Sequence, residues 1–173
     1  MQVLKKEIYE AIEDNAIKLF KQFSYEGANI DVIAEKANIS TGNIYRYYKN
    51  KRAIYDKVTA KAYKMLDEVA DEILEKKHIK PEEIIENIID IYKKEKYSTI
   101  ILLGVKNTIN NELLEKYEKI FVKTFKKGED NYLYEVYGKS MFYAFRVMID
   151  KDHTAIKLND KLIKYVKNYW KKY

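Results

Sequence analysis

The chain has 173 residues, 47% of them hydrophobic, and 33 Lys and Arg residues against 27 Asp and Glu give it a formal net charge of +6. A chain of this length buries about 70% of its unfolded surface, so it can fold without disulfides or metal ions. It contains no cysteine, which excludes disulfides, thiolate zinc sites and a cysteine nucleophile. Its two histidines, His78 and His153, are far apart in the sequence, so we expect no metal site and no cofactor.

The composition also predicts the fold class and the compartment. The N-terminus lacks the apolar stretch of a secretory signal, and the longest apolar run, residues 100–105, is far shorter than the roughly 20 residues of a membrane span. We therefore expect a soluble, cytoplasmic protein with no membrane partner. Five glycines and one proline leave little turn chemistry for hairpins, while Lys, Glu, Ala, Leu and Ile fill long periodic stretches. This pattern predicts an all-α fold of about nine helices.

The N-terminal quarter predicts three helices. The first covers about 20 residues, because apolar side chains recur at steps of three and four: Leu4, Ile8, Ile12, Ala16, Leu19, Phe20 and Phe23. Residues 24–28 interrupt it. Asn29 then caps a short helix over 30–37, and Asn38 tolerates the left-handed backbone of a sharp turn. Ser40 caps a third helix, over about 41–47, with Ile44 and Tyr48 on its buried side.

The remainder of the chain predicts longer helices. Asn50 can cap a fourth helix, over 51–76, which is long enough to join the small N-terminal unit to the rest. Pro81 suits the first turn of a fifth, and residues 97–127 are helical with interruptions near Gly104 and around residues 110 and 111. Gly128 ends this stretch, and two further helices, about 130–150 and 156–173, carry broad apolar stripes. We predict two domains, one over residues 1–50 and the other over residues 51–173.

One window combines charge, spacing and side-chain type. Glu35 and Asp56 enclose 20 residues without an acid, and these contain five cations, Lys36, Arg46, Lys49, Lys51 and Arg52, with Tyr45, Tyr47 and Tyr48 interspersed among them. Two short helices joined by a tight turn, with small or polar groups at the start of the second and cations around it, match the geometry of helix-turn-helix DNA binding. The alternative is that the tyrosines pack internally and the cations form a solvated face.

The order of these residues resembles a known family. Ile12, Ala16, Leu19 and Phe20, followed by the run from residue 33 to residue 51, look like the N-terminal DNA-binding domain of the TetR family of transcriptional regulators. The resemblance covers about residues 8–56. Ser24 and Asn38 stand where the family commonly has glycine, which the fold accommodates at a modest backbone cost.

The resemblance implies a homodimer that places two recognition helices in successive major grooves of an operator, roughly 34 Å apart. The predicted DNA-binding residues are Asn29, Thr41, Gly42, Asn43, Tyr45, Arg46, Tyr47, Lys49 and Lys51, with Lys51 on a phosphate. The last two helices would pair with their counterparts through Tyr134, Tyr137, Met141, Phe145, Leu162, Tyr165, Val166, Tyr169 and Trp170. An unknown small-molecule effector would bind among Tyr63, Tyr92, Asn107, Tyr117 and Phe121. The predicted function is a repressor released by that effector.

Two alternatives from other classes remain. A helical-bundle enzyme could use a carboxylate pair such as Glu82 and Glu86, but that pair lies in Lys-rich surroundings typical of a solvated face. A basic protein that binds membrane surfaces would spread its cations along one long helix, whereas here they follow residue 43.

Overall fold

The computed structural model describes residues 2–78, 80–107, 109, 111–125 and 131–150. These residues form eight α-helices and no strand, which confirms the all-α prediction. The helices are α1 (Gln2–Gly27), α2 (Ile30–Lys36), α3 (Thr41–Ile44), α4 (Lys51–Glu75), α5 (Pro81–Lys94), α6 (Lys96–Leu103), α7 (Asn111–Phe125) and α8 (Asn131–Asp150). The predicted helix over 156–173 lies outside the described residues. Among those residues, no helix combines the length and apolarity needed to cross a membrane, and no group of acids and histidines could hold a metal ion.

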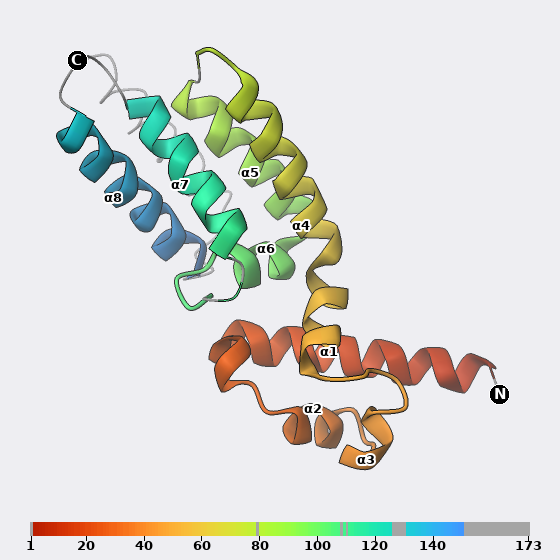
Figure 1. Ribbon diagram of the computed structural model, residues 1–173. Helices are drawn as coiled ribbons and strands as arrows, with labels where there is room; N and C mark the ends of the chain where they lie inside the picture. The colour runs from red at the N-terminus through yellow and green to blue at the C-terminus, as the bar shows by residue number, and fades with distance from the viewer. Residues whose placement is uncertain (1, 79, 108, 110, 126–130, 151–173) are drawn as a thin grey trace.

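The helices form two groups (Figure 1). Helices α1, α2 and α3 form a small unit, and α4 rises from it into a bundle with α5, α6, α7 and α8. Each group has its own hydrophobic core. The small unit's core also includes Ile54 and Tyr55 from the start of α4, and Ile101 from α6. The first turns of α4 therefore pack as part of the N-terminal unit, while the boundary at residue 50 stays a prediction.

The predicted caps and turns of the small unit are in place. The side chains of Asn29, Ser40 and Asn50 accept hydrogen bonds from the first-turn N–H groups of α2, α3 and α4 at 2.7, 3.2 and 2.8 Å. Such N-caps satisfy donors that a helix start leaves unpaired. Each cap fixes the residue at which its helix begins.

Both residues that replace a family glycine adopt positive φ. Ser24 has φ 67° and breaks α1, and Asn38 has φ 57° after the end of α2. At Asn38 the turn is a Schellman motif, since its N–H donates to Glu35 O and that of Ile39 donates to Ala34 O. The left-handed backbone expected at Asn38 is confirmed.

The bundle is closed by a close approach of α7 and α8. A Cβ added at Gly138 would lie 2.5 Å from the Cα of Val122, so only glycine lets the two backbones come this near. Phe121 packs across the contact against Phe142 and Phe145, with ring centroids 5.3 and 5.9 Å apart. This arrangement fixes α8 firmly on the bundle (Figure 1).

Candidate nucleic-acid interface

Helix α3 is short and anchored on one side. Ile44 is fully buried and Tyr48 nearly so, as predicted. The regular helix ends at Ile44 instead of continuing to residue 47, and residues 45–47 form a turn in which Ile44 O accepts from the N–H groups of both Tyr47 and Tyr48. This tighter turn brings Tyr48 inward, where its hydroxyl donates to the Glu13 carboxylate.

The opposite side of α3 is open. Gly42 is exposed, and a Cβ added to it would meet nothing within 4 Å. Neither the protein's packing nor its backbone requires a glycine there, so the position suits close approach by a ligand. Tyr45 is 51% exposed, Arg46 is exposed, and Arg46 Nη1 donates to Asn43 Oδ1 at 3.5 Å. Thr41 and Asn43 are partly exposed on the same short helix.

The three tyrosines after Ile44 have different environments. Tyr9 makes edge-to-face contacts with Tyr47 and Tyr48, with centroids 5.0 and 5.6 Å apart. Burial, together with the neighbouring Glu13, raises the pKa of Tyr48. Tyr48 and, in large part, Tyr47 thus pack against other residues of the protein, whereas Tyr45 is available to contact a partner. The DNA contact predicted for Tyr47 stays a prediction.

Lys51 has a role within the protein. Its Nζ donates to Tyr25 O at 2.7 Å and to Ala28 O at 2.8 Å, and it lies 4.5 Å from the centre of the Tyr25 ring. The ammonium group thus satisfies carbonyls in the turn after Ser24. These bonds compete with the phosphate contact predicted for Lys51. Lys49 and Asn29 are exposed, and Asn29 also serves as the cap of α2.

The five predicted effector residues do not share one cavity. Tyr92, Tyr117 and Phe121 are buried in the bundle core, and the Tyr117 hydroxyl donates to Leu66 O at 2.9 Å. Tyr63 is partly exposed and lines an open hollow of about 490 Å³ between α4 and the residues around the start of α7. Asn107 lies elsewhere, at the contact between the bundle and the small unit.

The predicted interface residues of α8 divide between two faces. Phe145 is buried in the bundle core beside Phe121, so an interface role for it does not fit this placement. Tyr134 and Met141 are partly buried, and Tyr137 is exposed. Helix α8 also exposes other large apolar side chains, namely Tyr132, Leu133, Val136 and Tyr143. The interface prediction omitted these four, although their position in a broad apolar stripe signals such a face. The predicted residues Leu162, Tyr165, Val166, Tyr169 and Trp170 lie outside the described residues.

Comparison with known proteins identifies the small unit. Residues 12–58 match the family described as "Bacterial regulatory proteins, tetR family". This N-terminal domain belongs to the TetR family. The HTH-type transcriptional regulator YhgD of Bacillus subtilis is 38% identical over 71 residues, which cover 41% of this chain and 35% of that protein. The biofilm-operon negative regulator IcaR of Staphylococcus epidermidis is 42% identical over 48 residues, or 28% of this chain and 26% of that protein. The chain thus spans about a third or less of the length of these curated relatives.

Solved structures of other proteins share the fold over most of the chain. A TetR-like regulator from Rhodococcus is 14% identical with a TM-score of 0.56, over 94% of this chain and 95% of that one. AibR, solved with isovaleryl coenzyme A and operator DNA, is 15% identical with a TM-score of 0.57, over 90% and 96% of the two chains. At these low identities the likeness shows the fold alone, and it covers the bundle as well as the small unit.

Proposed function

We propose that this chain is a transcriptional regulator that binds a palindromic operator as a homodimer. The observation that carries the proposal is the open edge of α3, where exposed Gly42, Tyr45 and Arg46 lie in a stretch of 20 residues without an acid. Exposed cations hold phosphates, while small and polar groups at the start of a recognition helix approach base edges. The TetR-family domain over residues 12–58 supports this use of the edge.

Selection of bound sequences from a random duplex library tests this proposal. We expect an enriched palindrome whose half-sites are about one helical turn apart. Tyr45→Ala should weaken binding to that duplex without lowering thermal stability, since the side chain is 51% exposed. Tyr97→Ala on α6 is the matched control, because Tyr97 is 47% exposed and lies on another element. Absence of enrichment, or equal effects of both variants, would refute the proposed DNA edge.

The exposed apolar face of α8 supports the homodimer. Leu133, Val136 and Tyr137 are each more than 40% exposed on adjacent turns of one helix, and apolar faces of this kind mark protein interfaces. A second copy of the chain covers such a face without any other partner, because a two-fold interface pairs the same patch from each copy. Analytical ultracentrifugation should give twice the chain mass of 20.7 kDa. A sedimenting species of 20.7 kDa at operator-binding concentrations would contradict the homodimer.

We further propose that the protein represses and that a small molecule releases it. The relative IcaR is described as a negative regulator, and FadR of Bacillus subtilis was solved with stearoyl-CoA at 20% identity and a TM-score of 0.50, over 91% of this chain and 97% of that one. In this chain the hollow beside Tyr63, of about 490 Å³, has the volume of small-molecule sites. A panel of acyl-coenzyme A thioesters, titrated into the operator complex, tests release. If no thioester changes operator affinity, this class of effector is excluded.

A further inference from the structure

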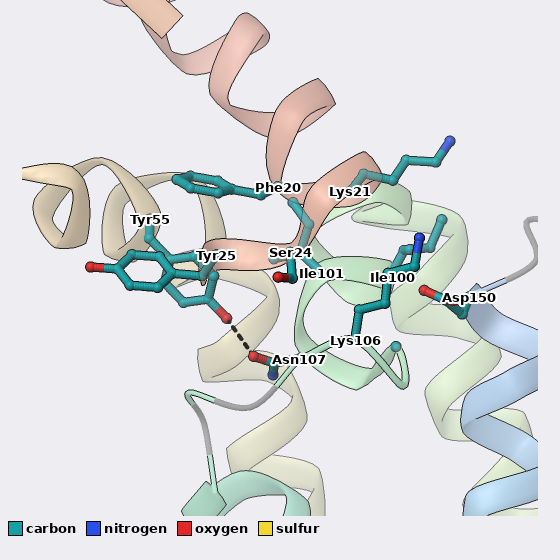
Figure 2. A pocket seen from close by; sticks show the side chains of 11 residues that line it. Phe20, Lys21, Ser24, Tyr25, Tyr55, Ile100, Ile101, Lys106, Asn107 and Asp150 are labelled. Atoms are coloured by element: carbon teal, nitrogen blue, oxygen red, sulfur yellow. Dashed lines mark hydrogen bonds between the residues drawn. The ribbon is translucent and has the colours of Figure 1, made fainter. Parts of the chain in front are cut away.

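The loop between α6 and α7 is tied to the small unit through Asn107. Asn107 is 7% exposed, and its Oδ1 accepts from the Tyr55 hydroxyl at 3.3 Å and from Ile109 N at 3.1 Å. Its Nδ2 donates to Leu102 O at 2.6 Å. A buried amide with its polar groups satisfied holds one orientation, because any rotation leaves a donor or acceptor unpaired. Figure 2 shows the bond from Tyr55 to Asn107 across the contact.

Helix α8 holds the same loop from the other side. Arg146 Nε donates to Leu103 O at 3.0 Å, and its Nη2 donates to Gly104 O at 2.8 Å and to Asn107 O at 3.2 Å. Leu103 is the last residue of α6, and Gly104 and Asn107 come after it. At such a helix end the carbonyl acceptors lack helical partners and the helix dipole favours a cation. Partial burial lowers the pKa of Arg146. The hydrogen bonds to three carbonyl oxygens compensate the charged guanidinium for the water that it loses on burial.

Tyr55 carries this connection into the DNA-binding domain. Its ring is 1% exposed and makes edge-to-face contacts with Phe20 and Tyr25, with centroids 5.4 and 5.3 Å apart. A second bond runs alongside, from Lys106 Nζ to Gln22 O of α1 at 3.1 Å. The loop thus contacts both α4 and α1 of the small unit, and Figure 2 places these side chains around one small cavity.

The cavity at this contact holds about 10 Å³, room for roughly one water molecule. Polar groups of Ser24, Tyr55, Asn107 and Asp150 line it together with Phe20. The contact is therefore close-packed, and it combines these polar groups with apolar side chains such as Ile100 and Ile101. Polar contacts depend on direction, so they specify an angle between two bodies more strongly than apolar packing does.

We propose that Tyr55, Asn107 and Arg146 are positioning residues that set the orientation of the DNA-binding domain relative to the bundle. Arg146 fixes the loop to α8, Asn107 fixes the loop to Tyr55, and Tyr55 is part of the core that supports α3. A displacement of α8 is thereby passed to the recognition helix. This inference deepens the proposed function and rests on it for the effect on DNA, whereas the orientation itself can be measured without DNA.

A pair of spin labels tests the orientation directly. Because the chain has no cysteine, Glu35→Cys on α2 and Glu86→Cys on α5 introduce exposed labelling sites, one in each body. Pulsed electron paramagnetic resonance on the full chain then gives the distance distribution between them. Tyr55→Phe in this background removes the hydroxyl bond to Asn107 and leaves the ring in place.

Tyr117→Phe is the matched control. Tyr117 is also fully buried, and its hydroxyl also donates one bond, but that bond to Leu66 O stays within the bundle. We expect both variants to lower the melting temperature by a similar amount, and only Tyr55→Phe to shift or broaden the distance distribution. Arg146→Lys, which keeps the charge and loses the planar fork, should broaden it as well. An unchanged distribution in Tyr55→Phe, or equal broadening in Tyr117→Phe, overturns the inference.

Operator affinity, measured on the same preparations, distinguishes this inference from the proposed function. Tyr55→Phe should change affinity by at least about fivefold, in the range of coupling between distant sites, and Tyr117→Phe should not. If the parent chain selects no duplex at all, the proposed function fails while the distance distributions still decide the orientation. If the parent binds its operator and Tyr55→Phe binds it equally well, the inference is overturned and the function stands.

Discussion

Lys51→Ala distinguishes a structural lysine from a phosphate contact. In the structure its ammonium group bonds the carbonyls of Tyr25 and Ala28 and lies over the Tyr25 ring. A hydrogen bond from a charged donor contributes about 1.5–3 kcal/mol, and water replaces part of this at a partly exposed site. We therefore expect the free energy of unfolding to fall by about 2 kcal/mol. For a chain of this size, that loss lowers the melting temperature by about 4–8 °C.

Thermal denaturation followed by circular dichroism measures this loss, and Lys49→Ala is the control because Lys49 is exposed nearby. The salt dependence of operator binding completes the test. A lysine that contacts a phosphate contributes about one unit to the slope of log affinity against log salt. We expect Lys49→Ala to lose that unit with its melting temperature unchanged, and Lys51→Ala to keep the slope. An unchanged melting temperature in Lys51→Ala, with one unit of slope lost, would refute the structural role of Lys51 and support the phosphate contact.

Three further predictions concern the contact between α7 and α8, the pKa of Tyr48 and the exposed face of α8. Gly138→Ala places a Cβ 2.5 Å from Val122 Cα, so the α7 and α8 backbones must separate. We expect the free energy of unfolding, measured by thermal denaturation, to fall by about 1–3 kcal/mol. An unchanged stability would contradict the close approach of the two helices. Burial and Glu13 raise the pKa of Tyr48 in the folded state, so the stabilisation is complete below the unfolded value of about 10 and is lost as pH rises above it. Tyr48→Phe should therefore lose less stability between neutral and strongly alkaline pH than the parent; equal losses would show that Tyr48 does not carry the effect. Tyr137→Glu adds a charge to the exposed face of α8 and should convert the proposed dimer to a monomer in analytical ultracentrifugation, whereas a persistent dimer would place the interface elsewhere.

Local chemistry made the DNA-binding domain predictable from sequence. Asn29, Ser40 and Asn50 cap helices because a side-chain oxygen near a free N–H acts within a few residues of its own position. Asn38 adopts positive φ for an equally local reason. The early end of α3 was not predictable from neighbouring residues, because the turn that follows it places Tyr48 against Glu13, a residue 35 positions earlier.

The bundle was less predictable because its roles depend on contacts between distant residues. Phe145 and Tyr137 lie in the same apolar stripe, yet one packs against Phe121 and the other is exposed. Periodicity locates a stripe but does not divide a broad one between the core and an interface. The effector prediction includes Asn107 because its amide interrupts an aliphatic run, and the structure places it at the contact between the two bodies. A related signal was available for Arg146, the only charged residue between positions 141 and 149.

The position of Arg146 suggests how the proposed regulator responds to events far from DNA. Helix α4 packs in both cores, so by itself it forms a continuous rod between them. A rod fixes the separation of the two bodies and leaves their rotation about its axis to other contacts. The loop held by Arg146 lies to one side of α4 and contacts both α4 and α1, which opposes that rotation. Because Arg146 belongs to the helix with the exposed apolar face, covering that face and orienting α3 involve the same helix. Assembly and DNA binding are therefore expected to be coupled in this chain, so an α8 variant that weakens the dimer should also alter operator affinity per protomer.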